Sequence, residues 1–162
     1  MQVFIANKIK DIKELKEIIG ELRERGKRIV FTNGCFDLLH IGHIRYLRKA
    51  KTKGDVLIIG LNSDNSVRKI KGKGRPIVPQ KERAEILSAL EFVDFVVIFE
   101  EKTPLKLIRR IKPDVLVKGG DWKGKEIVGE EFVNSYGGRV FILPFTRGRS
   151  TTLLIKKIKR LG

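Results

Sequence analysis

Cysteine, histidine and tryptophan are scarce in this 162-residue chain, which holds one cysteine, two histidines and one tryptophan. The single cysteine, Cys35, excludes an internal disulfide and agrees with a reducing compartment. Two histidines without further cysteine leave a zinc site short of ligands. No apolar run approaches the ~20 residues that a membrane span needs, and the first residues lack the charged start and long apolar segment of a secretory signal. We therefore expect a cytoplasmic protein with no membrane segment.

Acidic residues are few beside the basic ones, and the formal net charge is +16. Nucleic-acid binding is one explanation, because lysine and arginine neutralise backbone phosphates. However, the positive charge is mixed with glutamates, and few aromatic residues lie among the basic runs to stack on bases. A phosphate-rich small substrate, with a Lys/Glu-rich surface of the kind seen in heat-adapted proteins, accounts for the charge as well. We expect no nucleic-acid partner and keep a nucleic-acid-binding module as an alternative.

Hydrophobic periodicity predicts alternating helices and strands. Apolar residues at 12, 15, 18, 19 and 22 indicate an amphipathic helix over 11–25. Short apolar runs predict strands at 28–32, 56–61, 93–99, 113–117 and 139–143. Further helices are expected at 42–53, 79–91, 104–111, 126–136 and from 150–152 onward. The basic, glycine-containing segment 67–76 has no periodicity, which predicts a loop.

This alternation is typical of a doubly wound α/β fold, a five-stranded parallel sheet with helices on both faces. We expect a single domain, with a helical lead-in at 1–27 and the main domain at 28–162. In such sheets, ligands lie beyond the carboxyl ends of the strands. The unusual segments of the sequence follow predicted strands at that edge, and they are 34–43, 62–64 leading into 68–75, 118–124 and 146–152.

Both histidines lie in the first of these segments, where His40 and His43 flank Gly42 at the predicted start of a helix. The free N–H groups and the positive end of a helix dipole favour an anion there. Gly42 has no Cβ, so a phosphate can approach the backbone. The spacing places both imidazoles on one side of the first turn, where they can donate to phosphate oxygens. Alternatively, the two histidines are ordinary polar residues at a helix cap.

Five elements of the sequence carry a family resemblance: Gly34–His43, Lys71-Gly72 with Arg75-Pro76, Arg83, Lys118–Asp121 and Arg149–Thr152. Together they resemble the cytidylyltransferase-like nucleotidyltransferases over about residues 28–158. Within this superfamily, Thr32–Asp37, Leu116–Asp121 and Ser150–Thr152 look most like the heptose 1-phosphate adenylyltransferase domain of ADP-heptose synthases. The resemblance implies a Rossmann-like fold and transfer of AMP from ATP to D-glycero-D-manno-heptose 1-phosphate, giving ADP-heptose and pyrophosphate.

The same resemblance implies partners. The bifunctional synthases carry a sugar kinase domain in front of this domain, and this sequence lacks it, so a separate sugar kinase is expected in the pathway. Relatives commonly dimerise, which makes a homodimer a further expectation. Glycerol-3-phosphate cytidylyltransferases, which are close relatives, have an arginine where this chain has Phe145, yet they share the pair Asp121-Trp122. A cytidylyltransferase acting on glycerol 3-phosphate or a similar alcohol phosphate is therefore kept as an alternative.

The resemblance also implies roles for the matching residues. His40, His43 and Lys71 are expected to be catalytic, the histidines at the triphosphate and Lys71 at the α-phosphate or the incoming sugar phosphate. Arg75 and Arg83 are expected to hold a substrate phosphate through their planar guanidinium groups. The expected nucleotide-binding residues are Thr32, Asn33, Gly34, Phe36, Gly42, Lys118, Gly120, Asp121, Arg149, Ser150, Thr151 and Thr152.

Simpler interpretations stay open for several of these residues. Lys71 fits a solvated charge run, and Arg83 fits pairing with a glutamate of its own helix. Asp37 either orients a histidine or Mg²⁺, or simply caps the turn. Ser150–Thr152 can serve as a plain helix N-cap as well as a phosphate site. Mg²⁺ is expected with ATP because of the triphosphate charge, but no acidic cluster demands a dedicated metal site.

Overall fold

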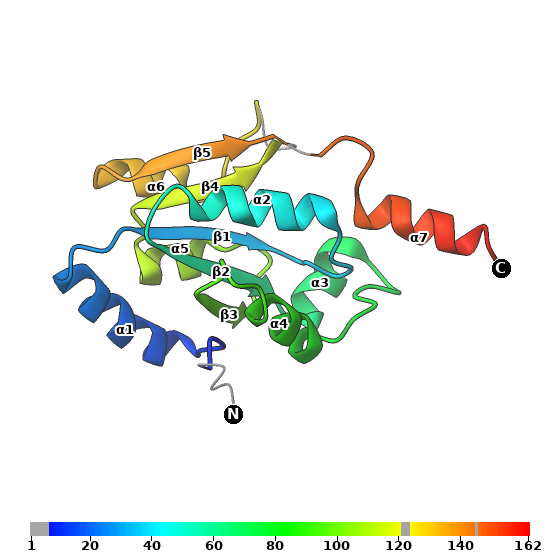
Figure 1. Cartoon of the computed structure of the whole chain (residues 1–162), viewed down its shortest axis with the longest axis horizontal. Coiled ribbons are helices and arrows are strands. Elements are labelled where there is room, and N and C mark those ends of the chain that lie inside the picture. The colour runs from blue at the N-terminus through cyan, green and yellow to red at the C-terminus, as the bar shows by residue number, and fades with distance from the viewer. Residues whose placement is uncertain (1–6, 121–123, 145) are drawn as a thin grey trace.

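The computed structural model, which describes residues 7–120, 124–144 and 146–162, is built on one parallel sheet (Figure 1). Its strands are β1 (Ile29–Gly34), β2 (Val56–Asn62), β3 (Phe95–Phe99), β4 (Val115–Gly119) and β5 (Arg139–Leu143). They form a 5-stranded sheet in the order β3-β2-β1-β4-β5, and every neighbouring pair is parallel. The predicted doubly wound α/β fold is confirmed.

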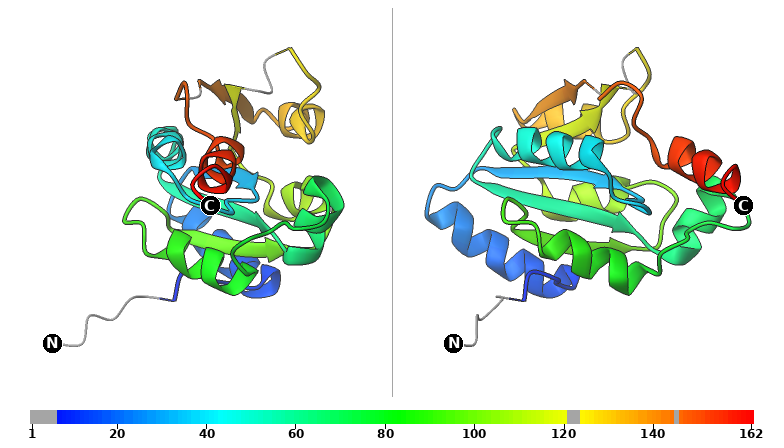
Figure 2. Two further views of the ribbon diagram at one scale, coloured as in Figure 1. Left: turned by 90° about the vertical axis from the view of Figure 1, so that its right-hand side faces the viewer. Right: turned by 45° about the vertical axis from the view of Figure 1, so that its right-hand side comes forward.

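Helices cover both faces of this sheet (Figures 1 and 2). They are α1 (Ile12–Glu24), α2 (Ile41–Lys51), α3 (Asp64–Lys71), α4 (Gln80–Ser88), α5 (Leu105–Ile111), α6 (Glu130–Ser135) and α7 (Thr151–Lys159). Side chains of α1, α5 and α6 form one buried cluster with Ile29 and Phe31 of β1. Those of α2 and α4 form the other cluster with Val30 of the same strand. The two-residue alternation of a strand thus divides the core into two layers.

The expected lead-in helix belongs to the first of these clusters. Leu15 and Ile19 of α1 are buried there with residues of α5. Arg23 adds a polar link, because its Nη2 donates to the carbonyl oxygen of Ile111 at 2.9 Å. Among the described residues, no helix is both long enough and apolar enough to cross a membrane.

Helix α3 corrects the expectation of a loop over 67–76, because residues 64–71 are helical. The Ser63 side chain accepts from Ser66 N–H as an N-cap, and Val67 is fully buried. The helix ends at Gly72, whose φ of 89° is a conformation that glycine adopts readily. The helix is only eight residues long and carries two apolar residues, Val67 and Ile70, so its N-cap serine is the clearest local signal for it.

Helix α7 differs from the other helices because none of its residues is buried. It follows β5 and extends away from the sheet beyond the carboxyl ends of the strands (Figures 1 and 2). The hydroxyl of Thr151 donates to the carbonyl oxygen of Leu38 at 3.3 Å, in the loop between β1 and α2. The first turn of α7 is therefore attached to the segment that carries both histidines.

Gly60 of β2 offers a test of the core packing. An added Cβ would lie 2.7 Å from Phe31 Cζ and 3.0 Å from Leu107 Cδ2. We expect Gly60→Ala to lower the free energy of unfolding by about 1–3 kcal/mol, the usual cost of overpacking a core. Gly20→Ala is the control, because nothing lies within 4 Å of its added Cβ. In that exposed helical position alanine should stabilise by roughly 0.5–1 kcal/mol. Urea unfolding measures both values, and equal stabilities would contradict the packing described.

Candidate functional site

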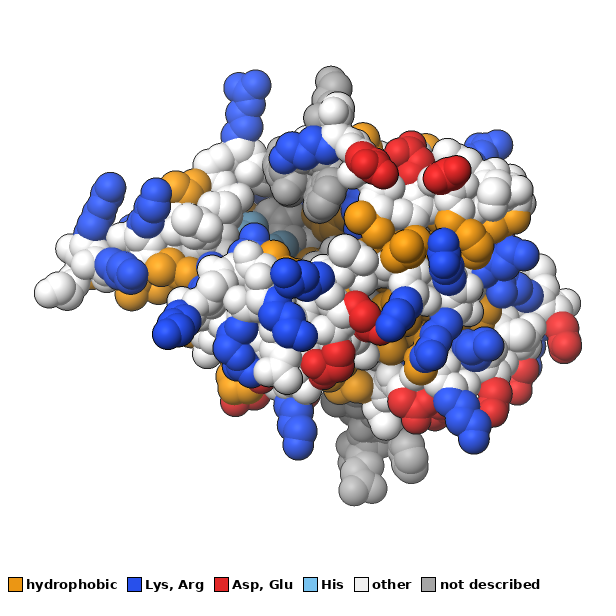
Figure 3. All heavy atoms as spheres, turned by 180° about the vertical axis from the view of Figure 1, so that it is seen from behind, with side chains coloured by type: hydrophobic (Ala, Val, Ile, Leu, Met, Phe, Trp, Pro, Cys, Tyr) orange, Lys and Arg blue, Asp and Glu red, His pale blue; other side chains and the backbone are white. Residues whose placement is uncertain are grey.

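A cleft of about 680 Å³ lies at the carboxyl ends of the strands, where the sequence places its unusual segments. All four segments contribute to its lining. A fifth segment, Lys102–Pro104, follows β3 and also lines the cleft, although no motif marks it in the sequence. Figure 3 shows this hollow with histidine atoms visible inside it and lysine and arginine side chains around it. The parallel sheet therefore brings every strand end to one site.

His40 and His43 form the base of this site at the start of α2. His40 Nδ1 accepts from Gly42 N–H at 3.1 Å, and His43 Nδ1 accepts from His40 N–H at 3.4 Å. The two rings are stacked, with centroids 3.9 Å apart. A neutral imidazole that accepts at Nδ1 carries its proton on Nε2. Both side chains therefore have a second nitrogen that is an N–H donor, as a phosphate oxygen requires.

The surroundings keep these imidazoles neutral. Burial, and then the charge of Arg149, lower the pKa of His40 below its ordinary value. Burial, and then His40, lower the pKa of His43 to about 4. Two stacked rings cannot both carry a positive charge without strong repulsion. At neutral pH the pair therefore serves as hydrogen-bond donors, and it gains a proton most readily when an anion lies beside it.

Lys118 and the start of α7 border the same part of the cleft. Lys118 lies at the end of β4 with only 4% of its surface exposed, and its Nζ donates to Asn33 Oδ1 at the end of β1. Ser150 caps α7 by accepting from Leu153 N–H at 3.1 Å. The N-cap interpretation of Ser150 thus describes the structure, and it leaves the first turn of a nine-residue helix beside the imidazoles.

Asp37 holds the basic segment that follows α3. Its side chain is fully buried and accepts from Arg75 Nε at 2.6 Å. It also accepts from the N–H groups of Ile77 and Val78, at 2.8 and 2.9 Å. Burial opposes ionisation, but these hydrogen bonds outweigh it and hold the pKa of Asp37 below its ordinary range. Asp37 therefore orients Arg75 and the backbone that follows it. It neither orients a histidine nor caps the turn of its own loop.

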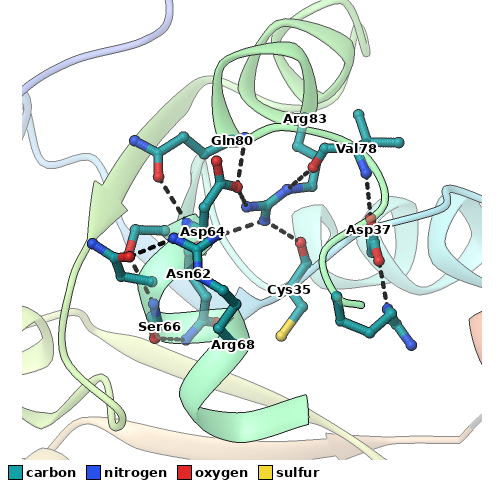
Figure 4. Close-up of polar contacts among 12 residues, drawn as sticks. Cys35, Asp37, Asn62, Asp64, Ser66, Arg68, Val78, Gln80 and Arg83 are labelled. Atoms are coloured by element: carbon teal, nitrogen blue, oxygen red, sulfur yellow. Dashed lines mark hydrogen bonds and ion pairs between the residues drawn. The ribbon is translucent and has the colours of Figure 1, made fainter. Parts of the chain in front are cut away.

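Arg83 lies behind the cleft and does not line it. Its guanidinium donates to the carbonyl oxygens of Val78 at 2.8 Å, Cys35 at 2.6 Å and Asn62 at 2.9 Å. It also donates to Asp64 Oδ1 at 2.8 Å (Figure 4). With 1% of the residue exposed, it cannot reach a substrate. The expected phosphate contact is therefore replaced by a structural role, and the partner is Asp64, not a glutamate of α4.

The structure gathers most of the predicted site residues. Those that line the cleft are Asn33, Gly34, Phe36, His40, Gly42, His43, Lys71, Arg75, Lys118, Arg149, Ser150, Thr151 and Thr152. Thr32 is buried outside the cleft, with its Oγ1 2.7 Å from Tyr46 Oη. Gly120 also lies outside the lining, which instead includes its neighbour Gly119. Asp121, Trp122 and Phe145 lie outside the described residues.

The described residues of the cleft offer few side chains that could serve as ligands of a metal ion. No group of three or more histidine, cysteine, aspartate or glutamate side chains is placed to hold a metal ion there. Asp37 is the one carboxylate among the described lining residues, and both of its oxygens are already hydrogen-bonded. Cys35 also lines the cleft, and burial raises the pKa of its thiol. Its sulfur is therefore a poor nucleophile at neutral pH.

Substitution of Arg83 tests its structural role. We expect Arg83→Met to lower the free energy of unfolding by about 3–5 kcal/mol, because it removes the cation that pairs with Asp64 and the donor to three carbonyl groups. Lys81→Met, at an exposed position of the same helix, should have almost no effect. Denaturant unfolding measures both variants. A stable Arg83→Met protein with weakened substrate binding would instead support the phosphate contact.

The low pKa of His43 predicts how stability depends on pH. The folded protein binds a proton at His43 only near pH 4, whereas an unfolded chain does so near 6.5. Stability should therefore fall as the pH is lowered from about 6.5 toward 4, because the unfolded state binds the proton first. Urea unfolding across this range should show a smaller slope for His43→Asn than for the wild type. Identical slopes would contradict the neutral imidazole.

The comparisons with known proteins agree with this geometry. A model of the cytidylyltransferase-like family matches residues 31–157. The chain is 58% identical over 152 residues to the bifunctional protein HldE of Geotalea uraniireducens (strain Rf4). It is 59% identical over 153 residues to that of Geobacter metallireducens. These matches cover 94% of this chain but only 31% of each relative.

Solved structures show the same fold. The lipopolysaccharide core biosynthesis protein from Thermoplasma volcanium GSS1 matches with a TM-score of 0.63 and 32% identity, over 76% of this chain and 100% of that chain. The pantoate-beta-alanine ligase from Francisella tularensis matches with a TM-score of 0.65 over 88% of this chain and 68% of that chain. At 20% identity, the second likeness concerns the fold alone. Because the family model spans most of the sequence, the chain belongs to the cytidylyltransferase-like family and is a nucleotidyltransferase.

Proposed function

We propose that the chain transfers the AMP group of ATP to a sugar 1-phosphate, with D-glycero-D-manno-heptose 1-phosphate as the acceptor, and releases pyrophosphate. The observation that carries this proposal is the group of hydrogen-bond donors around His40 and His43, at the end of β1, which can bind phosphate oxygens. The heptose is supported by the sequence motifs and by the 58% identity to bifunctional protein HldE. A separate sugar kinase is proposed to act before this reaction in the pathway.

In this reaction an oxygen of the sugar phosphate attacks the α-phosphorus of ATP. The bond between the α-phosphorus and the oxygen that bridges it to the β-phosphate breaks, and pyrophosphate leaves. Such transfers depend mainly on positioning and on stabilisation of negative charge. His40 and His43 would donate from Nε2 to the triphosphate, beside Lys118 and the N–H groups at the start of α7. These donors are held before the substrate arrives, so little reorganisation is needed.

Mg²⁺ is proposed to enter with ATP as part of the substrate. The donor set fits this proposal, because Asp37 is occupied by Arg75 and by two backbone N–H groups. The triphosphate oxygens would therefore hold the ion, with its charge offsetting theirs. The lysine and arginine side chains of the cleft supply the remaining positive charge.

Pyrophosphate release tests the function directly. ATP and CTP would each be paired with the heptose 1-phosphate and with glycerol 3-phosphate, in buffer containing Mg²⁺. We expect turnover with ATP and the heptose. His43→Ala should lower that rate by on the order of 10²–10³ without changing the melting temperature, as for the loss of one transition-state donor.

The other mixtures distinguish the alternatives. Turnover of CTP with glycerol 3-phosphate, and none of ATP with the heptose, would favour the cytidylyltransferase. A nucleic-acid-binding module would instead bind an oligonucleotide tightly at moderate salt, and His43→Ala would leave that binding unchanged. Unchanged pyrophosphate release in His43→Ala would contradict the assignment of the imidazoles.

A further inference from the structure

A second group of cationic side chains lines the cleft, apart from the histidines, Lys118 and the start of α7. Lys71 ends α3, Arg75 follows it, and Lys102 lies in the connection after β3. The sheet order β3-β2-β1-β4-β5 places the ends of β2 and β3 on one side of β1. The ends of β4 and β5, with Lys118 and α7, lie on the other side. The imidazoles after β1 thus separate two positively charged walls.

The segments that carry Lys71 and Lys102 are held together. The hydroxyl of Ser66, in α3, donates to the carbonyl oxygen of Glu101 at 2.7 Å. The hydroxyl of Ser63, which caps α3, donates to Glu100 Oε2 at 2.8 Å. The connection after β3 is therefore attached to α3, and Lys102 is carried beside the helix that ends in Lys71.

Two of the three cations of this wall, Lys71 and Lys102, have no acidic partner in the part of the chain that is described. Arg75 binds Asp37 through Nε alone, which fixes the plane of its guanidinium. A cleft with cations on two walls and one occupied carboxylate favours two anionic ligands. A triphosphate bound by the imidazoles and the start of α7 would neutralise only the wall that carries Lys118.

The geometry of phosphoryl transfer identifies the second ligand. The attacking oxygen and the leaving oxygen lie roughly in line, on opposite sides of the α-phosphorus. If pyrophosphate leaves from the imidazoles and α7, the attacking group must come from the side of Lys71 and Lys102. An acceptor phosphate monoester carries about two negative charges at neutral pH, because its second pKa is about 6. Its oxygen can attack without losing a proton, so no free carboxylate is needed as a base.

We propose that Lys102, with Lys71 and the Asp37-oriented Arg75, forms the subsite that binds the phosphate monoester of the acceptor. This inference rests on the proposed function and assigns a ligand to Lys102. The oxygen of that phosphate forms the new bond to the α-phosphorus, and the electron pair of the broken bond leaves with pyrophosphate. Lys102 holds the acceptor in line for this attack.

Steady-state kinetics of Lys102→Ala test the subsite. The KM for the sugar phosphate should rise about ten- to a hundredfold, the effect of one lost hydrogen bond to a charged group. The KM for ATP should stay within about twofold, and Lys102→Arg, which keeps the charge, should recover most of the loss. Lys106→Ala is the matched control, because Lys106 is 76% exposed and pairs with Glu101 at 3.6 Å outside the cleft.

A binding measurement keeps the subsite testable if no acceptor turns over. Glycerol 3-phosphate would be titrated into the wild type, Lys102→Ala and Lys106→Ala, each saturated with α,β-methylene ATP, which cannot release pyrophosphate. Weaker binding to Lys102→Ala alone supports the subsite even where the wild type makes no ADP-sugar, a result that overturns the proposed function only. The subsite is overturned if Lys102→Ala and Lys106→Ala bind glycerol 3-phosphate equally and have the same KM for the sugar phosphate. It is also overturned if Lys102→Ala raises the KM for ATP as much as the KM for the sugar phosphate. Turnover by the wild type would still support the proposed function in either case.

Discussion

The buried guanidinium of Arg83 is the interaction on which the site depends. It joins the carbonyl groups at the ends of β1 and β2 to Asp64 at the start of α3 and to Val78 before α4. Parallel strands end in carbonyl groups that their own ladder leaves partly unpaired, and burying them without a donor is costly. One cation with five N–H donors satisfies several of them at once. The floor of the cleft is therefore held by charge as well as by apolar packing.

The positive character of the cleft follows from this arrangement. Asp37 pairs with Arg75 and Asp64 pairs with Arg83, so these two carboxylates do not neutralise Lys71 or Lys102. Burial, followed by the charge of Arg149 at His40 and by His40 at His43, lowers the pKa of both imidazoles and favours their neutral form before a substrate arrives. An incoming triphosphate reverses that balance and raises their proton affinity. The donors thus become stronger when the negative charge that they stabilise is present.

The sequence predicts the sheet well because its signals are local. Buried strands appear as continuous apolar runs, and the histidines flank a glycine at a predicted helix start. The position of the cleft then follows from the parallel arrangement, which places the carboxyl ends of the strands at one edge. The predictions failed where a residue depends on distant partners. Arg83 contacts Cys35 across 48 positions, and Asp37 contacts Ile77 across 40. Charge and residue type cannot distinguish a buried arginine from one that binds phosphate, because the same planar donors serve both purposes. Lys102 gave no signal, because a single exposed lysine follows no motif.

The proposed reaction favours a phosphate nucleophile over an alcohol for a chemical reason. An alcohol must lose its proton as it attacks, and the protein must then supply a base with a matched pKa. Among the described lining residues, Asp37 is bound to Arg75 and two N–H groups, and both imidazoles accept hydrogen bonds at Nδ1 and hold their proton at Nε2. A phosphate monoester arrives already ionised and needs only cations to align it with the α-phosphorus. In the proposed reaction Lys71, Arg75 and Lys102 would supply that alignment, so an acceptor of this kind would need no base from the described lining residues.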